Sequence, residues 1–268
     1  MTASVQQRID DLWTRRTDPA TDRAEIRAAA VEAIELLDDG SCRVADVVDD
    51  EVIVHEWLKR AILLYFVAAD DSVSQVGPFQ HRDRVPLASG LGARGVRAVP
   101  GSIVRWGAHV EPGCVLMPCF VNIGARVGAG SMVDTWATVG SCAQVGRNVH
   151  ISGGVGLGGV LEPPQAAPVV IEDDAFVGSR SMITEGARVG RGAMLGAGVI
   201  LNPSVPVIDA ETGLEVSRGV VPAWSLVINA TRPRDFPGGT FGLPCALDHQ
   251  AVEGGAAARQ GRAQRPAS

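Results

Sequence analysis

The sequence predicts a mainly β protein, in which a left-handed parallel β-helix follows an N-terminal α-helical domain. Aliphatic residues recur at every sixth position through the middle of the chain, a period that neither a helix nor a simple strand has. Glycine accounts for 32 of the 268 residues and aromatic residues for only 4%, a composition typical of repeated tight turns. The segment 1–85 shows helical patterns instead.

Residues 1–85 are predicted to form a helical domain with one hairpin. Thr21 is the expected N-cap of the second helix, because its side chain can accept from the first turn. Apolar stretches on both sides of Asp49 predict a hairpin within 43–54. Residues 86–98, which are polar and interrupted by Gly and Pro, are predicted to be a connector. The helices are expected over 5–16, 21–38 and 55–69.

The hexapeptide period decides the fold. Stepping by six from Val115 meets only aliphatic residues: Val115, Val121, Val127, Val133, Val139, Val145, Ile151 and Leu157. The position four further on is always small or β-branched. After an interruption at 159–168 the period resumes at Ile171, Val177, Ile183, Val189, Leu195 and Leu201. Three such units close one triangular coil of about 18 residues, with aliphatic side chains inside and small ones near the corners.

These patterns predict the domain boundaries. The β-helix is assigned to 99–230, with a hairpin excursion at about 203–219 around the turn-like Asp-Ala-Glu-Thr-Gly. A C-terminal segment covers 231–247, and the low-complexity residues 248–268 are expected to be a disordered tail. A β-sandwich would instead show turn signals every 8–12 residues and no fixed period of six.

Composition and charge argue against several function classes. The net charge of −6 argues against nucleic-acid binding. Five cysteines without a CxxC pair fit neither a disulfide framework nor a zinc ribbon, so no metal is expected. No apolar run is long enough to span a bilayer and no signal-peptide pattern is evident. We therefore expect a cytoplasmic protein that does not bind membranes.

Residues 132–163, MVDTWATVGSCAQVGRNVHISGGVGLGGVLEP, resemble the signature region of the tetrahydrodipicolinate N-succinyltransferase family. GVRAVPGSIVR at 95–105, VIEDDAFVGSR at 170–180 and VIDAETG at 207–213 are similar to the same family in the same order. The resemblance covers roughly residues 5–245. It implies succinyl transfer from succinyl-CoA, as co-substrate, to the amino group of 2-amino-6-oxopimelate, the ring-opened form of hydrated tetrahydrodipicolinate. It also implies a homotrimer with sites between subunits, and no permanently bound cofactor.

The attacking amine must lose a proton, which a positioned carboxylate can accept. Asp134 follows an inward aliphatic residue where Gly is common. On its own it would more often be a solvated or turn-stabilising corner residue, but it matches the family's catalytic aspartate. Glu185 matches a second family carboxylate, and Arg97 an arginine that binds a substrate carboxylate. The further substrate-binding candidates are Arg180, Ser141 and Ser152, and the expected CoA-binding residues are Gly153, Gly154, Gly178 and Ser179.

The chain departs from the family pattern in two places. Met182 stands where family members often have Glu, and the resemblance ends near Cys245, before the lysine-bearing segment that helps to close over CoA in the family. CoA phosphates would then meet arginines and backbone amides of the Gly-rich coils. His150 is interpreted as structural rather than as a base, and Cys119 and Cys142 as core thiols.

Other functions of the same fold remain alternatives. A γ-class carbonic anhydrase needs three clustered His ligands, whereas only His109 and His150 lie within the repeats. A nucleotide-sugar uridylyltransferase needs an N-terminal Rossmann-like domain with a phosphate loop, which the helical residues do not supply. Two alternatives stay open: a related acyl-CoA N-acyltransferase of changed acyl or acceptor specificity, and an inactive trimeric scaffold.

Overall fold

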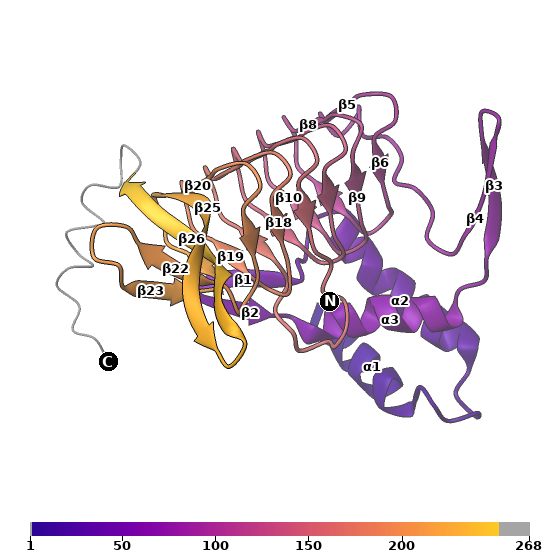
Figure 1. Ribbon diagram of the computed structural model, residues 1–268. Helices are drawn as coiled ribbons and strands as arrows, with labels where there is room; N and C mark the ends of the chain where they lie inside the picture. The colour runs from indigo at the N-terminus through magenta and orange to yellow at the C-terminus, as the bar shows by residue number, and fades with distance from the viewer. Residues whose placement is uncertain (1, 252–268) are drawn as a thin grey trace.

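The computed structural model describes residues 2–251 and contains a triangular β-helix with a helical domain beside its first coils (Figure 1). Helix α2 (Arg23–Asp38) begins after Asp22, whose side chain accepts a hydrogen bond from the Ala24 N–H at 2.9 Å. The predicted cap, Thr21, is therefore wrong by one residue, because the carboxylate of Asp22 stands closer to the free N–H groups of the first turn. The other two helices are α1 (Thr2–Arg15) and α3 (Glu56–Ala68).

Two hairpins accompany the helices. Strands β1 (Ala45–Val48) and β2 (Glu51–Val54) are joined by Asp49 and Asp50, which have positive φ values of 49° and 70° as a two-residue hairpin turn requires. Strands β3 (Ser72–Val76) and β4 (Phe79–Asp83) form a second hairpin that the sequence did not indicate. All five residues of β4 are exposed, so the segment has no apolar alternation to reveal it.

Three parallel sheets form the sides of the prism. Face 1 contains β5 (Arg97–Ala98), β8 (Val115–Leu116), β11 (Met132–Val133), β14 (His150–Ile151), β17 (Phe176–Val177), β20 (Met194–Leu195) and the start of β25 (Ser225–Phe236). Face 2 contains β6 (Ile103–Val104), β9 (Phe120–Val121), β12 (Thr138–Val139), β15 (Gly156–Leu157), β18 (Met182–Ile183) and β21 (Ile200–Leu201). Face 3 contains β7 (His109–Val110), β10 (Arg126–Val127), β13 (Gln144–Val145), β16 (Val170–Ile171), β19 (Arg188–Val189) and β24 (Val220–Val221).

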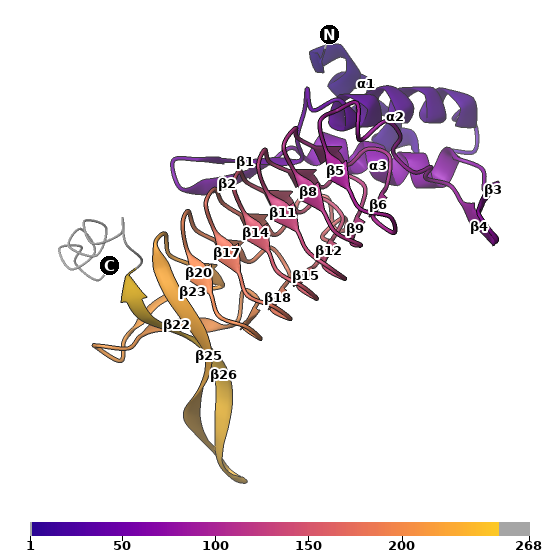
Figure 2. The ribbon, with the colours of Figure 1, turned by 90° about the horizontal axis from the view of Figure 1, so that it is seen from above.

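From β5 to β18 each strand pairs with the strand three further along the chain, so the chain visits faces 1, 2 and 3 in turn (Figure 2). Because the β22–β23 hairpin intervenes, β19 pairs with β24 and β20 with β25. Arg126 pairs with Gln144, one coil later, and Met132 pairs with His150 in the same way. The second residue of each two-residue strand from β8 onward is buried inside the prism, where these side chains form one continuous apolar core. The predicted fold class, a left-handed parallel β-helix of hexapeptide repeats with an N-terminal helical domain, is confirmed.

The predicted register is wrong at Val115. Leu116 is fully buried and Val115 is only half-buried, because β8 directs Leu116 into the prism. The step from Leu116 to the next inward residue, Val121, is therefore five positions rather than six. The corner between β8 and β9 spans only 117–119, whereas the corresponding corner of the next coil spans 134–137 and is one residue longer. The first coil begins with β5 at Arg97, slightly before the predicted boundary at 99.

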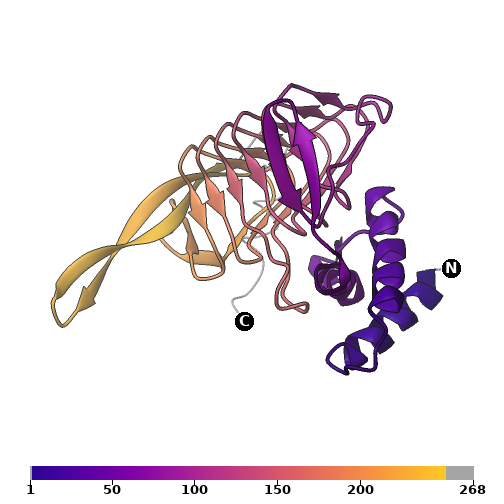
Figure 3. The same cartoon turned by 90° about the vertical axis from the view of Figure 1, so that its right-hand side faces the viewer.

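Insertions leave the prism at three places. A loop over 158–169 separates β15 from β16, and the hairpin of β22 (Pro206–Asp209) and β23 (Glu215–Arg218) lies within the predicted excursion. Strands β25 and β26 (Gly239–Ala251) then form a long antiparallel ribbon that projects beyond the last coil (Figure 3).

The predicted disordered tail begins too early. Asp248 is buried and accepts a hydrogen bond from the Ser225 hydroxyl at 2.8 Å, and β26 continues to Ala251. Backbone pairing of β26 with β25 and β22, rather than apolar side chains, holds these residues in the sheet. Residues 252–268, which make up the rest of the predicted tail, lie outside the described residues.

The first coil is covered by the segment that precedes it. Leu87 forms an antiparallel bridge with Arg105, and the Ala88 N–H donates to the Val104 carbonyl at 2.8 Å. Ala88 and Leu91 also pack against the core of the prism. No helix within residues 2–251 has the length and apolar character needed to cross a membrane.

Candidate functional site

The corners between faces 1 and 2, here called edge 1–2, carry most of the predicted site residues. From the corner after β11 onward, one residue in each corner adopts positive φ: Trp136 (60°), Gly154 (70°), Arg180 (60°) and Gly198 (74°). Its N–H donates to a carbonyl in the preceding coil, as from Gly154 to Thr135 (2.9 Å) and from Arg180 to Gly153 (3.1 Å). The corners therefore stack in register, and residues one coil apart lie next to each other along this edge.

Asp134 leaves face 1 at this edge. Its Oδ1 accepts hydrogen bonds from the Thr135 N–H (2.6 Å) and the Thr135 hydroxyl (3.1 Å), so part of the carboxylate stabilises the turn. Its Oδ2 has no hydrogen-bond partner among residues 2–251, and the side chain is half-buried. One oxygen thus holds the orientation of the carboxylate while the other remains able to accept a proton or a hydrogen bond.

Ser152 and Gly178 occupy the same position as Asp134 in the next two coils. The register pairs Val133 with Ile151 and Ile151 with Val177, so the residues that follow these strands form one column. Successive members of the column are about 4.8 Å apart, the usual spacing of paired strands. The structure therefore places Ser152 beside Asp134.

Arg97 and Arg180 are both exposed cations near this edge. Arg97 lies on face 1 two strands before β11, and Arg180 stands at the corner that follows β17. Neither guanidinium makes an ion pair or hydrogen bond within the described residues. Most other arginines within residues 2–251 are paired with a carboxylate, as in the contact of Arg126 with Glu111 at 2.6 Å. Unpaired arginines are well suited to bind the carboxylates of a ligand.

The predicted CoA-binding residues belong to the same corners, but only some of their backbone N–H groups are free to donate to a ligand. The N–H of Gly154 donates to Thr135 and that of Gly178 to the Leu195 carbonyl (2.8 Å), so neither amide can serve a ligand. The amides of Gly153 and Ser179 have no acceptor within residues 2–251. Gly154 has a further role, because a Cβ there would lie 3.4 Å from the Cγ of Arg180, whose stem crosses this corner.

Ser141 and Glu185 lie elsewhere, at the corners between faces 2 and 3, here called edge 2–3. Ser141 lies beneath the 158–169 loop, because its carbonyl accepts from the Val160 N–H at 3.1 Å. The loop approaches so closely that a Cβ on Gly140 would lie 2.3 Å from the Gly159 nitrogen. Glu185 is exposed, with a positive φ of 56°. One whole side of the prism, roughly 15 Å by the rise of a short extended segment, separates this edge from edge 1–2.

Within one chain, the structure therefore does not bring Glu185 or Ser141 to Asp134. The sequence contained a signal for this separation. Asp134 and Ser152 are separated by one full coil, whereas Ser141 follows Asp134 by less than half a coil and so belongs to the next corner.

The structure shows what surrounds His150, Met182 and the two cysteines that the sequence analysis singled out. The His150 ring stacks on Phe176 with centroids 5.1 Å apart and an interplanar angle of 17°. Met182 extends over Gly156, where a Cβ would lie 2.5 Å from the Met182 sulfur. Cys119 and Cys142 are buried, and burial raises the pKa of each thiol to about 12, so neither is a thiolate near neutral pH.

Sequence reasoning missed two residues at edge 1–2. Thr135 holds the carboxylate of Asp134, and Trp136 exposes 78% of its surface at the adjacent corner. A tryptophan within repeats of Gly, Ala and Val was a visible signal, since a large exposed ring is unusual on a surface with no contact to make. In the part of the chain that is described, no group of His, Cys, Asp and Glu is arranged to bind a metal ion.

Comparisons with known proteins agree with this architecture. Residues 4–67 match the family model described as tetrahydrodipicolinate N-succinyltransferase N-terminal, and residues 168–203 match the hexapeptide repeat of succinyl-transferase. The chain is 48% identical to the 2,3,4,5-tetrahydropyridine-2,6-dicarboxylate N-succinyltransferase of Paramagnetospirillum magneticum over 91% of each chain. It is 46% identical to the protein of the same name from Caulobacter vibrioides over 94% of each chain. The chain belongs to the 2,3,4,5-tetrahydropyridine-2,6-dicarboxylate N-succinyltransferase family.

Membership of this N-succinyltransferase family confirms the resemblance stated from the sequence and the prediction of an acyltransferase. Identity extends over nearly the full length of both relatives, so it covers the helical domain and the β-helix together. A third relative, from Methylorubrum populi, is 46% identical over 97% of this chain and 96% of its own. The alternatives built on a zinc-dependent anhydrase or a nucleotidyl transferase are therefore set aside.

Proposed function

We propose that the protein transfers the succinyl group of succinyl-CoA to the amino group of 2-amino-6-oxopimelate, the ring-opened form of hydrated tetrahydrodipicolinate. The names of the full-length relatives support the reaction class and the acceptor. The observation that carries the proposal within this chain is the carboxylate of Asp134, which is oriented by Thr135 through one oxygen and available through the other.

In the proposed reaction the acceptor amine attacks the thioester carbonyl. A C–N bond forms, the C–S bond breaks, and the CoA thiolate leaves and takes up a proton. The nitrogen must lose a proton during this sequence, and Oδ2 of Asp134 accepts it or holds the amine by a hydrogen bond. Because Oδ1 is already bound to Thr135, the carboxylate is oriented before the substrate arrives, and binding does not have to order it.

The two carboxylates of the acceptor are assigned to arginines. Arg97 and Arg180 are exposed and lack partners within residues 2–251, and both lie on the same side of the prism as Asp134. A planar guanidinium can donate two parallel hydrogen bonds to a carboxylate. Ser152, beside Asp134, adds a hydroxyl at the reacting end. Succinyl-CoA is proposed to be a co-substrate bound at this edge, where the amides of Gly153 and Ser179 are free to donate.

We assign the complete site to a homotrimer. Asp134 lies at edge 1–2 and Glu185 at edge 2–3, so a site that uses both requires edge 1–2 of one protomer to face edge 2–3 of another. Such a contact joins two different surfaces, and it closes into a ring when each rotation is one third of a turn. Exposed apolar residues support face 2 as the contact surface: Ile103, Met182, Ile200 and, at its border, Trp136.

A thiol-release assay with purified protein tests this proposal. It uses 2-aminopimelate as the acceptor and compares succinyl-CoA with acetyl-CoA. We expect release that requires both succinyl-CoA and the acceptor. In Asp134→Asn, kcat should fall about 100-fold or more, the usual contribution of a general base, while the protein remains folded. Asp174→Asn is the matched control. Asp174 is an exposed aspartate with positive φ at the corner between faces 3 and 1, where none of the proposed site residues lies.

The outcomes separate the alternatives. Release with acetyl-CoA alone would assign the protein to acetyl transfer, and Met182 would then be the first residue to examine, since it replaces a carboxylate often found in the family. No release with either thioester would favour a changed acceptor or an inactive scaffold. Near-normal turnover of Asp134→Asn would contradict the role of Asp134 but not the family assignment.

A further inference from the structure

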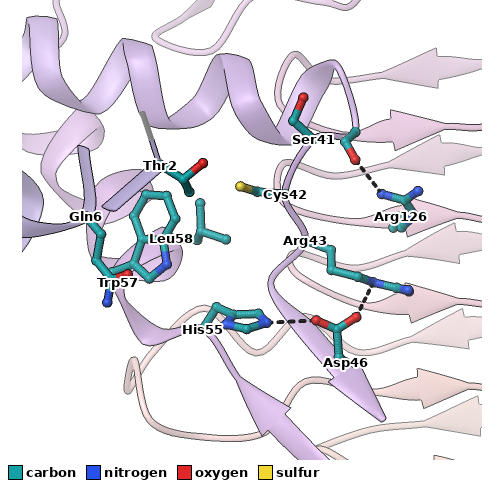
Figure 4. Close-up of a pocket in the computed structure, with 11 residues that line it drawn as sticks. Thr2, Gln6, Ser41, Cys42, Arg43, Asp46, His55, Trp57, Leu58 and Arg126 are labelled. Carbon is teal, nitrogen blue, oxygen red and sulfur yellow. Dashed lines mark hydrogen bonds and ion pairs between the residues drawn. The ribbon is translucent and has the colours of Figure 1, made fainter. Parts of the chain in front are cut away.

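A cavity of about 490 Å³ lies between the helical domain and face 3, away from edge 1–2 (Figure 4). The first turns of α1 and α3, the segment before β1 and strand β10 surround it. Its lining residues are Thr2, Gln6, Gly40, Ser41, Cys42, Arg43, Asp46, His55, Trp57, Leu58 and Arg126. The volume is within the range of small-molecule sites. None of these residues takes part in the proposed transfer reaction.

One wall of the cavity is cationic. Each nitrogen of Arg126 already donates one hydrogen bond, to Glu111 through Nε and Nη2 and to the Gly40 carbonyl through Nη1. Arg43 has fewer partners. Its Nε donates to the Gln144 side-chain oxygen at 3.3 Å and lies 3.5 Å from Asp46, while Nη1 and Nη2 have no hydrogen-bond partner among residues 2–251.

The charge of Arg43 is only partly compensated. Burial and the neighbouring Arg126 guanidinium lower the pKa of Arg43, despite the presence of Asp46. Asp46 is shared, since its other oxygen lies 2.8 Å from His55 Nε2. A half-buried guanidinium with two free N–H-bearing nitrogens attracts an anion, and a carboxylate matches the geometry of its fork.

The opposite wall is apolar. Trp57 and Leu58, at the start of α3, and the sulfur of Cys42 border the cavity across from Arg43 (Figure 4). Trp57 and Leu58 expose only 6% and 1% of their surface, so this wall is formed by the packed start of α3, whereas Gln6 is exposed at the rim. The cavity thus has an anion-binding end and an apolar end.

We propose that this cavity is a second ligand site that binds a small organic carboxylate. The carboxylate would accept hydrogen bonds from Nη1 and Nη2 of Arg43, and the apolar end of the ligand would lie against Trp57 and Leu58. A cation is disfavoured, because Asp46 already interacts with Arg43 and His55. Since the cavity joins the helical domain to the prism, a bound ligand would stabilise their contact.

Calorimetric titration of the full-length protein tests the proposal, with 3-phenylpropionate as the probe and 3-phenylpropionamide as its neutral counterpart of equal size. We expect saturable binding of the carboxylate with a Kd on the order of 1 mM or tighter and at least tenfold weaker binding of the amide. Arg43→Gln should weaken carboxylate binding at least tenfold while leaving thiol release from succinyl-CoA unchanged, so the two proposals can fail separately.

A second pair of variants guards against misfolding of Arg43→Gln. Gln6→Trp fills the rim of the cavity from an exposed helix position and should abolish binding. Gln7→Trp changes the next exposed residue of α1, which does not line the cavity, and should bind as the wild type does. Equal affinity for carboxylate and amide, equal binding by Gln6→Trp and Gln7→Trp, or no saturable binding would each overturn the proposal.

Discussion

Lys59 is the only lysine of the chain, and its side chain is completely buried. Its ammonium donates to the carbonyls of Pro163 (3.2 Å) and Ala166 (2.8 Å), both in the loop that covers Ser141. Burial lowers the pKa of Lys59. A buried cation held by backbone carbonyls connects helix α3 to this loop, and through it to edge 2–3.

Lys59→Met should loosen the 158–169 loop, because the substitution leaves two carbonyls without their donor at a cost of about 1–3 kcal/mol. We expect the amides of Val160 and Ala166 to exchange at least about tenfold faster, as measured by hydrogen–deuterium exchange. Arg23→Met is the matched control, since Arg23 donates to the carbonyls of Ala68 and Ala69, away from the loop. Equal exchange in both variants would contradict this role.

Cys119 makes stability depend on pH in the alkaline range. Burial raises its pKa from 9.0 to about 12 in the folded protein. Between these values the unfolded chain loses the thiol proton while the folded chain retains it, so the free energy of unfolding falls as pH rises. The fall is about 1.4 kcal/mol per pH unit for one thiol. Urea unfolding between pH 9 and 10.5 should show a shallower fall for Cys119→Ala than for the wild type.

The residue-level site was only partly predictable from the sequence. The motif around Asp134 indicated the catalytic candidate, and counting whole coils along the sequence would have placed Ser152 beside it and Ser141 at another edge. The free amides of Gly153 and Ser179 were not predictable, because they depend on which N–H of each corner bonds to the preceding coil.

In strand β8, the length of the following corner decides which side chain points into the prism. Val115 and Leu116 are both aliphatic, so the sequence period alone cannot choose which one points inward. The shorter corner that follows β8 selects Leu116. From Val121 onward every corner in the first stretch of repeats has the same length, and the period of six predicts the inward residues correctly.

Leu116→Ala should therefore destabilise the protein by about 2–5 kcal/mol, the usual result of removing a large core side chain. Val115→Ala should cost less than about 1 kcal/mol, since Val115 lies on the outer side of face 1. Denaturant unfolding of both variants measures the difference. A larger loss of stability in Val115→Ala than in Leu116→Ala would contradict this register and support the one that the period of six predicts.

The long ribbon of β25 and β26 could not be predicted because its side chains carry no pattern. Its projecting part, Thr231 to Gly242, pairs backbone to backbone with exposed side chains on both sides, so neither burial nor alternation marks it in the sequence. Its last residues are ordered by a partner distant in sequence, since β26 also pairs with β22.

At the scale of the whole molecule, the prism leaves face 2 exposed while the helical domain and the β1–β2 hairpin cover face 3. The contact with face 3 extends far along the prism, because Arg188 in β19 donates to Asp50 at 2.7 Å. Of the two remaining faces, face 2 borders both edges that carry the predicted catalytic carboxylates.

Ile200→Glu should therefore disrupt the proposed trimer. Ile200 is 48% exposed in the isolated chain, and a carboxylate buried there against a second copy would lack a partner. We expect sedimentation velocity to show monomers and the thiol-release assay to show a matching loss of activity. Val67→Glu, at a 58% exposed position on α3, is the control and should remain trimeric. A trimeric Ile200→Glu variant would refute face 2 as the contact surface.

The segments at the two ends of the prism cover open strand edges. A stack of parallel strands has a row of unpaired N–H and C=O groups at each end, which could template the addition of another molecule. At the first coil, the bridge between Leu87 and Arg105 occupies part of this row. At the last coil, β26 continues face 1 into an antiparallel ribbon that a parallel coil cannot extend. The strands of this protein are stacked as in a fibre, but these two segments hinder the addition of another molecule at either end.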